Sequence, residues 1–219
     1  MKSYKCIIFD CDGVLVDSEV LAIRTLIGLA NEQGANIELK YALQHFKGSY
    51  LEECFRKIEA ISGKPLPQDF ETKFRKRSFE IFKNELQPVK GIKDVLENLT
   101  VPFCTASSGP QEKIRLNLTT TGLRHFFEEN IFSCYDIGKW KPDPAIFLHA
   151  ADAMGFGPED CLVVEDSIVG VRAANAGGFD VFGFAELNEN DDFVKEATAI
   201  FYDMGELISI IESANERHP

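Results

Sequence analysis

Two aspartates, Asp10 and Asp12, stand two residues apart at the end of a short apolar run, and Gly13 follows them. Side chains at positions i and i+2 point the same way while a chain stays extended, so both carboxylates can act on one ligand. Such a pair suits a nucleophile beside an acid–base group, or two ligands of a hard cation such as Mg²⁺. A solvated turn after a strand is the other interpretation, because Asp and Gly are common in turns.

Small hydroxyl residues form a second candidate segment. Thr105, Ser107 and Ser108 precede Gly109 and a stretch with helical periodicity. A hydroxyl at that point can hold a phosphate together with the free N–H groups at the start of the helix. An ordinary helix cap uses the same residue types, so both interpretations stay open at this stage.

Two charged segments complete the set of candidates. Lys141 lies in a proline-rich turn, where its ammonium could balance the charge of a phosphate, although a solvated surface lysine is the plainer interpretation. Glu165 and Asp166 end another apolar run and could supply oxygen ligands to Mg²⁺. Asp166 or Ser167 could also cap the next helix, which is compatible with either role.

The elements expected to position these residues alternate between strands and helices. Short apolar runs predict buried strands at 5–9, 101–106, 130–133, 161–165 and 180–184. Helical patterns lie between the later runs, at 111–120, 144–154 and 168–176. This alternation predicts right-handed βαβ units and an α/β fold, a Rossmann-like doubly wound parallel sheet. Ligand sites of such sheets lie at the carboxyl ends of the strands, close to the candidate residues.

Residues 17–88 break this alternation. They contain apolar positions at helical spacing, such as Leu51, Phe55 and Ile58, and no convincing strand. We therefore expect a helical domain at 17–88, inserted into a core that is formed by residues 1–16 and 89–219.

Charge and composition restrict the partners. The chain has 35 acidic and 23 basic residues, a net charge of −12 that repels nucleic acids and anionic membrane surfaces. Its 6 cysteines are scattered without a CxxC pair, which predicts buried free thiols in a reducing compartment. No apolar run approaches the ~20 residues that span a bilayer, and the N-terminus does not resemble a signal peptide. We expect a cytoplasmic monomer that binds neither nucleic acid nor membrane.

Taken together, these segments resemble the haloacid dehalogenase superfamily of phosphotransferases. The family's four motifs are matched by Asp10 with Asp12, by Ser107, by Lys141, and by Glu165 with Asp166. The helical insert is similar to the family's cap domain, and the resemblance extends over essentially the whole chain.

The resemblance implies a role for each matched residue. Asp10 would attack phosphorus to form an aspartyl-phosphate, and Asp12 would serve as the general acid and base. Mg²⁺ would be held by the Asp10 carboxylate, the Asp12 backbone carbonyl and Asp166, with Glu165 orienting its water shell. Ser107, the Ser108 amide and Lys141 would hold the phosphoryl oxygens. Thr105 is a second possible hydroxyl, but the alignment favours Ser107.

Further segments place the chain near the 6-phosphogluconate phosphatase subgroup and, more loosely, near the β-phosphoglucomutases. The segments lie at Phe9 to Ser18, Phe46 to Gly48, Ser108 to Pro110, Tyr135 to Ile137 and Trp140 to Ala145. Among these, Lys47 with Gly48 would contact the substrate, with Lys47 reaching a substrate carboxylate.

The same resemblance bears on the outcome of the reaction. The mutases carry a cap histidine and a cap arginine where this chain has Ala22 and Leu51. We therefore expect a Mg²⁺-dependent phosphatase acting on a small phosphorylated metabolite, a sugar or sugar-acid phosphate. A phosphosugar mutase and a non-catalytic phosphometabolite sensor are the alternatives.

Overall fold

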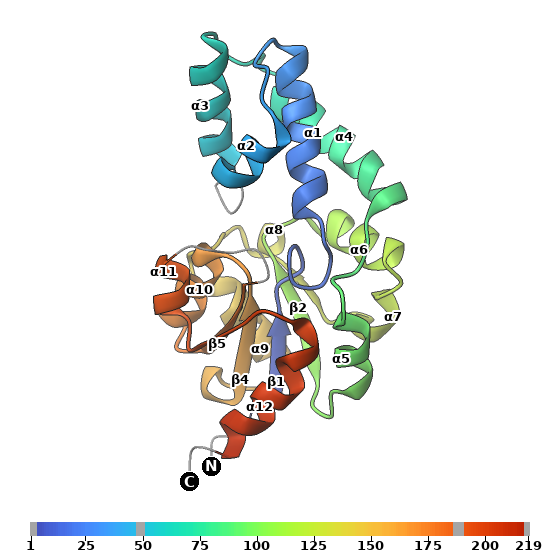
Figure 1. Cartoon of the computed structure of the whole chain (residues 1–219). Coiled ribbons are helices and arrows are strands. Elements are labelled where there is room, and N and C mark those ends of the chain that lie inside the picture. The colour runs from blue at the N-terminus through green and yellow to red at the C-terminus, as the bar shows by residue number, and fades with distance from the viewer. Residues whose placement is uncertain (1–3, 47–50, 186–190, 217–219) are drawn as a thin grey trace. The chain divides into compact units, whose positions relative to one another are not determined.

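The chain folds into two compact units, seen in the computed structural model (Figure 1). The structure describes residues 4–46, 51–185 and 191–216. The core unit comprises Met1–Val16 and Gln87–Pro219, and the helical unit comprises Asp17–Leu86. Lys47 and Gly48, two of the predicted substrate-binding residues, lie outside the described residues.

The core unit is built on a sheet of six parallel strands in the order β3-β2-β1-β4-β5-β6. The strands are β1 (Cys6–Phe9), β2 (Phe103–Ser107), β3 (Ile131–Ser133), β4 (Cys161–Glu165), β5 (Asp180–Phe184) and β6 (Ala199–Phe201). The predicted α/β class with a doubly wound parallel sheet is confirmed. The edge strand β6 was not expected from the sequence, because three residues are too few to show a periodic pattern.

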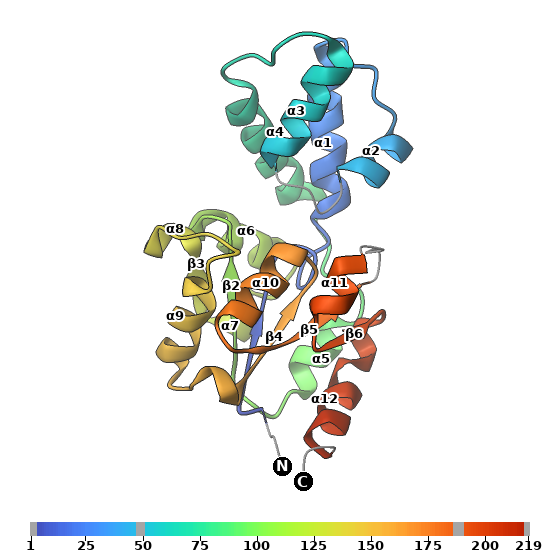
Figure 2. The ribbon, with the colours of Figure 1, turned by 90° about the vertical axis from the view of Figure 1, so that its left-hand side faces the viewer.

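Helices cover both faces of this sheet (Figure 2). Their bounds are α5 (Ile92–Asn98), α6 (Gln111–Thr120), α7 (Arg124–Phe127), α8 (Cys134–Ile137), α9 (Ala145–Met154), α10 (Ile168–Ala176), α11 (Asp191–Glu196) and α12 (Leu207–Glu216), with short 3₁₀ helices at Pro158–Asp160 and Met204–Glu206. On one face Cys6 and Ile8 belong to an apolar core to which α9, α10 and α11 also contribute side chains. On the other face Phe9, Phe103 and Phe127 form a row of edge-to-face contacts, at centroid distances of 6.1 and 5.4 Å. Because alternate residues of a strand point to opposite faces, β1 is buried on both.

Strand β1 lies inside the sheet, and successive strands are added on both of its sides. Strand β1 pairs with β2 on one side and with β4 on the other, and Phe9 is level with Thr105 and Val164. The residues that follow these strands therefore meet at one edge of the sheet, between β2 and β4. Open α/β sheets bind ligands at such a switch point.

The described residues of the helical unit form four helices around an apolar core of their own. They are α1 (Glu19–Glu32), α2 (Leu39–His45), α3 (Leu51–Ser62) and α4 (Phe70–Glu85). Leu26, Ile58 and Phe70 are among the side chains that close this core. The Asn31 side-chain NH₂ donates to the carbonyl of Ile37, and its side-chain oxygen accepts from the N–H of Ile37. These two bonds fix the turn after α1.

Two predictions from composition bear on the described residues. All six cysteines are free and buried, as expected. Within the part of the chain that the structure describes, no helix has the length and apolar character needed to cross a membrane.

Candidate active site

A buried cluster of three charged side chains, the strand-end cluster, lies at the carboxyl edge of the sheet. It consists of Asp10 after β1, Glu165 at the end of β4 and Lys141 from the loop before α9. The Lys141 Nζ atom lies 2.5 Å from Asp10 Oδ1, 2.7 Å from Glu165 Oε1 and 3.2 Å from the carbonyl oxygen of Ala106. The three residues are 7%, 1% and 7% exposed, in the order Asp10, Glu165, Lys141. The structure thus brings together three of the predicted site residues from segments far apart in the sequence.

The electrostatics of this cluster are unbalanced. Burial on its own would lower the pKa of the Lys141 ammonium, but the attraction of Asp10 and Glu165 outweighs it and raises that pKa. Burial raises the pKa of the Asp10 carboxyl above its ordinary value; Lys141 counteracts the rise, and the nearby charge of Glu165 adds to it. One ammonium thus serves two buried carboxyl groups.

Local packing fixes Lys141 and Glu165. The Lys141 ammonium lies 4.7 Å from the centroid of the Phe147 ring, a cation–π contact. The Ser167 N–H and hydroxyl both donate to Glu165 Oε2, at 2.9 Å each, while the Ser167 hydroxyl accepts from the N–H of Gly170 as the cap of α10. A Cβ atom on Gly170 would lie 1.8 Å from Glu165 Oε1, so only glycine leaves room for this carboxylate.

Asp12 is held by helix α6, an arrangement that the sequence did not suggest. The Lys113 Nζ atom lies 2.6 Å from Asp12 Oδ2, and the Asn117 amide donates to Asp12 Oδ1 at 3.3 Å. We call Lys113 and Asn117 the α6 pair. Their spacing of four residues puts both on one face of a helix, which is the signal that could have found them. The Asn117 side-chain oxygen is buried and has no hydrogen-bond partner among the described residues, at a typical penalty of ~1–3 kcal/mol.

The hydroxyl residues after β2 differ in their positions. Ser107 is buried at the end of the strand, and its Oγ accepts from the N–H of Gly109 at 3.1 Å. Ser108 is exposed, and its Oγ lies 3.9 Å from Cys134 Sγ. Thr105 is level with Phe9, within the paired part of the strand, and its buried hydroxyl has no partner among the described residues. Ser107 lies at the carboxyl edge of the sheet and is therefore better placed than Thr105 to face a ligand.

Asp166 follows Glu165 and lies against the turn that contains the two aspartates. A Cβ atom on Gly13 would lie 1.9 Å from Asp166 Oδ2, and Gly13 has a φ of +82°. The Gly13 N–H donates to the carbonyl of Val16 at 2.8 Å, which closes the turn. Both the backbone conformation and the close carboxylate require glycine at this position.

Comparison with known proteins identifies the architecture. A sequence model of the haloacid dehalogenase-like hydrolases matches residues 4–178. The chain is 33% identical over 208 residues to the 6-phosphogluconate phosphatase of Escherichia coli K12, and the match covers 94% of each chain. The chain belongs to the haloacid dehalogenase-like hydrolase family.

Two further relatives agree with this assignment. A phosphorylated carbohydrates phosphatase of Thermotoga maritima is 25% identical, over 90% of this chain and 92% of its own. The crystal structure of a haloacid dehalogenase-like protein from Agrobacterium tumefaciens matches with a TM-score of 0.89 at 31% identity, covering 97% of this chain and 100% of that one. The family resemblance read from the four motifs is thus confirmed, and so is the prediction of an enzyme of the phosphatase type.

The donor atoms at the edge of the sheet fit the Mg²⁺ ion that this family resemblance implies. No three His, Cys, Asp or Glu side chains in the described ranges are arranged to hold a metal by themselves. The predicted set needs only two carboxylates, those of Asp10 and Asp166, and the backbone carbonyl of Asp12. Mg²⁺ is commonly bound by one or two carboxylates and keeps several waters. A second reason why a cation suits this hydrolase is that the strand-end cluster has one ammonium for two buried carboxyl groups.

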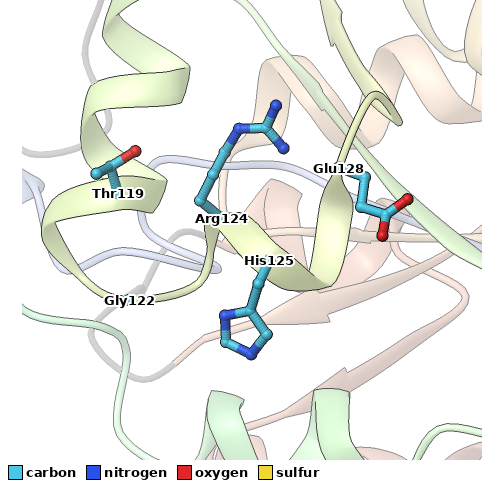
Figure 3. Close-up of a pocket in the computed structure, with 5 residues that line it drawn as sticks. All are labelled: Thr119, Gly122, Arg124, His125 and Glu128. Carbon is cyan, nitrogen blue, oxygen red and sulfur yellow. The ribbon is translucent and has the colours of Figure 1, made fainter.

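A shallow depression lies elsewhere on the core unit (Figure 3). Its volume is about 380 Å³, and it is lined by Thr119, Gly122, Arg124, His125 and Glu128, at the end of α6 and around α7. None of the predicted site residues lines it. Its lining offers no carboxylate pair with a lysine, in contrast to the strand-end cluster.

Proposed function

We propose that this hydrolase is a Mg²⁺-dependent phosphatase that acts on small sugar or sugar-acid phosphates through an aspartyl-phosphate on Asp10. The observation that supports the proposal most directly is the buried contact of 2.5 Å between Asp10 and Lys141, beside Asp12. A carboxylate can attack a phosphate only where a cation offsets the repulsion between the two anions. Lys141 supplies one such charge at the nucleophile itself.

The reaction has two steps that regenerate the enzyme. The Asp10 carboxylate attacks phosphorus, the bond to the ester oxygen breaks, and Asp12 gives its proton to the leaving alkoxide. Asp12 then takes a proton from water, whose oxygen attacks the phosphorus of the aspartyl-phosphate. Inorganic phosphate leaves, and Asp10 is again a carboxylate while Asp12 is again protonated.

Other residues of the chain stabilise these steps. Lys141, the Ser107 hydroxyl and the Ser108 N–H hold the phosphoryl oxygens, and Glu165 keeps Lys141 in place. Asp10, Asp166 and the Asp12 carbonyl would hold Mg²⁺. When bound, that ion supplies positive charge that favours the approach of one anion to another.

We infer the substrate class from the names of two relatives and not from the shape of a pocket. Their names refer to 6-phosphogluconate and to phosphorylated carbohydrates. We propose a compact carbohydrate phosphate as the substrate, with 6-phosphogluconate among the better ones. Ala22 and Leu51, in place of the histidine and arginine implied for mutases, favour transfer of the phosphoryl group to water.

The test is a phosphate-release assay over a panel of sugar and sugar-acid phosphates, with Mg²⁺ and with excess chelator. We expect release only with Mg²⁺, and a loss of several orders of magnitude in Asp10→Asn, which keeps the shape of the side chain but removes the nucleophile. Full activity in chelator, or undiminished release by Asp10→Asn, would contradict the mechanism.

A second assay separates hydrolysis from mutase activity. β-Glucose 1-phosphate is incubated with a trace of the 1,6-bisphosphate, and both products are followed. We expect free phosphate to predominate. Faster formation of glucose 6-phosphate than of phosphate would show that the enzyme is a mutase.

A further inference from the structure

We infer that Lys113 and Asn117, the α6 pair, are positioning residues that fix the Asp12 carboxylate for proton transfer to the leaving group. The inference rests on the proposed function. It assigns a role to two residues that lie outside the four motifs, and it makes a separate prediction about which substrates need them.

Each residue of the α6 pair contacts one of the two carboxylate oxygens of Asp12. Lys113 contacts Oδ2 at 2.6 Å and Asn117 donates to Oδ1 at 3.3 Å, so rotation of the carboxylate would break one contact or the other. The Asp12 side chain is 32% exposed, so a substrate can reach this carboxylate while the α6 pair holds it. A general acid works only within hydrogen-bond reach of the oxygen that it protonates, so fixing its direction has value for catalysis.

Burial supports a functional rather than a structural reason for Asn117. Its side chain is fully buried, and its oxygen has no partner in the part of the chain that is described. A leucine has the same branched shape and no polar atom, so it would avoid that penalty, and the amide is not needed for the fold at this position. What the amide provides is a donor aimed at Asp12.

Helix α6 also connects this carboxylate to the phosphate-binding segment. The helix begins at Gln111, two residues after the Ser107–Gly109 turn, and its first two turns carry Lys113 and Asn117. The groups proposed to hold the phosphoryl oxygens and the groups that orient the acid are therefore placed by one rigid element. The leaving-group oxygen is attached to that same phosphorus, so their relative position determines whether the proton arrives.

The experiment compares a poor leaving group with a good one. An alkyl phosphate such as glycerol phosphate needs a proton on its leaving oxygen, whereas 4-nitrophenyl phosphate does not. The ratio kcat/KM reports the steps up to loss of the leaving group. In Lys113→Met we expect kcat/KM to fall about 10- to 100-fold for the alkyl phosphate, part of the ~10²–10⁴-fold that acid–base catalysis contributes. For 4-nitrophenyl phosphate we expect less than about a threefold change.

Three variants serve as comparisons. Lys113→Arg keeps a cationic donor and should recover most of the alkyl-phosphate activity. Asn117→Leu should lower kcat/KM in the same selective way while its melting temperature stays equal to that of the wild type or rises. Arg115→Met removes a cation from the same helix, where it pairs with the exposed Glu129, and should change neither substrate's kcat/KM.

Equal losses on both substrates in Lys113→Met would overturn the inference, because they would assign Lys113 to phosphate binding. An unchanged rate on the alkyl phosphate would also overturn it. Crystal structures of the wild type and of Lys113→Met give an answer without any assay, since the Asp12 carboxylate should change direction in the variant. If the wild type released no phosphate at all, the proposed function would be wrong, and an unmoved Asp12 in these structures would separately refute the role of Lys113.

Discussion

The core unit and the helical unit use charged residues in opposite ways. At the strand ends of the core, Asp10, Glu165 and Lys141 are buried, and both carboxyl groups bind Lys141. In the helical unit the ion pairs lie on the surface, as between Arg77 and Glu32 at 2.6 Å, with side chains 43% and 54% exposed. Exposed pairs of this kind contribute little to stability, whereas buried ones are expensive to desolvate.

The difference between the two units lies in buried charged groups, which lower the stability of the core unit directly after β1. The helical unit keeps apolar side chains inside and charges outside, which is what folding alone requires. The core unit follows the same rule in its sheet, where Ile7, Ile8 and Phe9 are fully buried, and departs from it directly after β1. Buried groups that reduce stability are expected at sites that carry out a reaction.

Replacement of the shared lysine is expected to have the largest effect. Lys141→Met keeps the length of the side chain but leaves two buried carboxylates facing each other. We expect phosphate release to fall about 10³-fold, and the free energy of unfolding to fall by about 3–5 kcal/mol, as when one partner of a buried ion pair is removed. Phosphate assays and urea unfolding measure the two effects.

The matched control removes a cation from the helical unit. Arg77→Met breaks the exposed pair with Glu32, so neither phosphate release nor the urea midpoint should change appreciably. Should Arg77→Met destabilise the protein as strongly as Lys141→Met does, the contrast between the two units would not hold.

Much of the strand-end cluster was predictable because its residues follow apolar runs. Asp10 and Glu165 end runs that are too short for buried helices and are followed by helical patterns, and parallel strands bring such ends to one edge. The class of the fold and the segments that meet at the site followed from that logic. The three-residue strand β6 lay below the length at which a pattern can be recognised.

The contacts between the side chains of the site were harder to predict from the sequence. Glu165 was expected to serve a metal, as an oxygen ligand or by orienting its water shell. Its 2.7 Å contact with Lys141 depends on the loop that returns Lys141 to the sheet. Lys113 and Asn117 were missed because their role depends on the angle at which α6 crosses the turn after β1. Side-chain spacing specifies a face of a helix but not what that face meets.

The second prediction separates the two hydroxyls of β2. Ser107 stands at the carboxyl edge, whereas Thr105 lies two residues earlier in the paired strand. Ser107→Ala should lower phosphate release about 100-fold by removing one donor to the phosphoryl oxygens. Thr105→Val should leave release unchanged and keep or raise the melting temperature, because it removes a buried hydroxyl that has no partner among the described residues. The opposite pattern would identify Thr105 as the phosphate-binding residue.

The smallest effect is expected from two glycine substitutions, one in each unit. Gly170 lies in α10 of the core, where a Cβ atom would collide with Glu165 at 1.8 Å. Gly170→Ala must displace that carboxylate and with it Lys141. We expect the free energy of unfolding to fall by about 1–3 kcal/mol, as in other overpacked sites. Phosphate release should fall about tenfold, within the ~100-fold that a shift of about 1 Å can cause.

Gly28 provides the matched change in a helix of the helical unit. No atom lies within 4 Å of a Cβ atom built on it, and its backbone is helical, in the middle of α1. Gly28→Ala should therefore stabilise the protein by about 0.5–1 kcal/mol, because alanine loses less backbone entropy than glycine on folding. The same substitution thus has opposite signs in the two units, measured as the shift in urea midpoint at constant slope. A stabilising Gly170→Ala with full activity would show that Glu165 has room to move and that its place beside Lys141 is not fixed by Gly170.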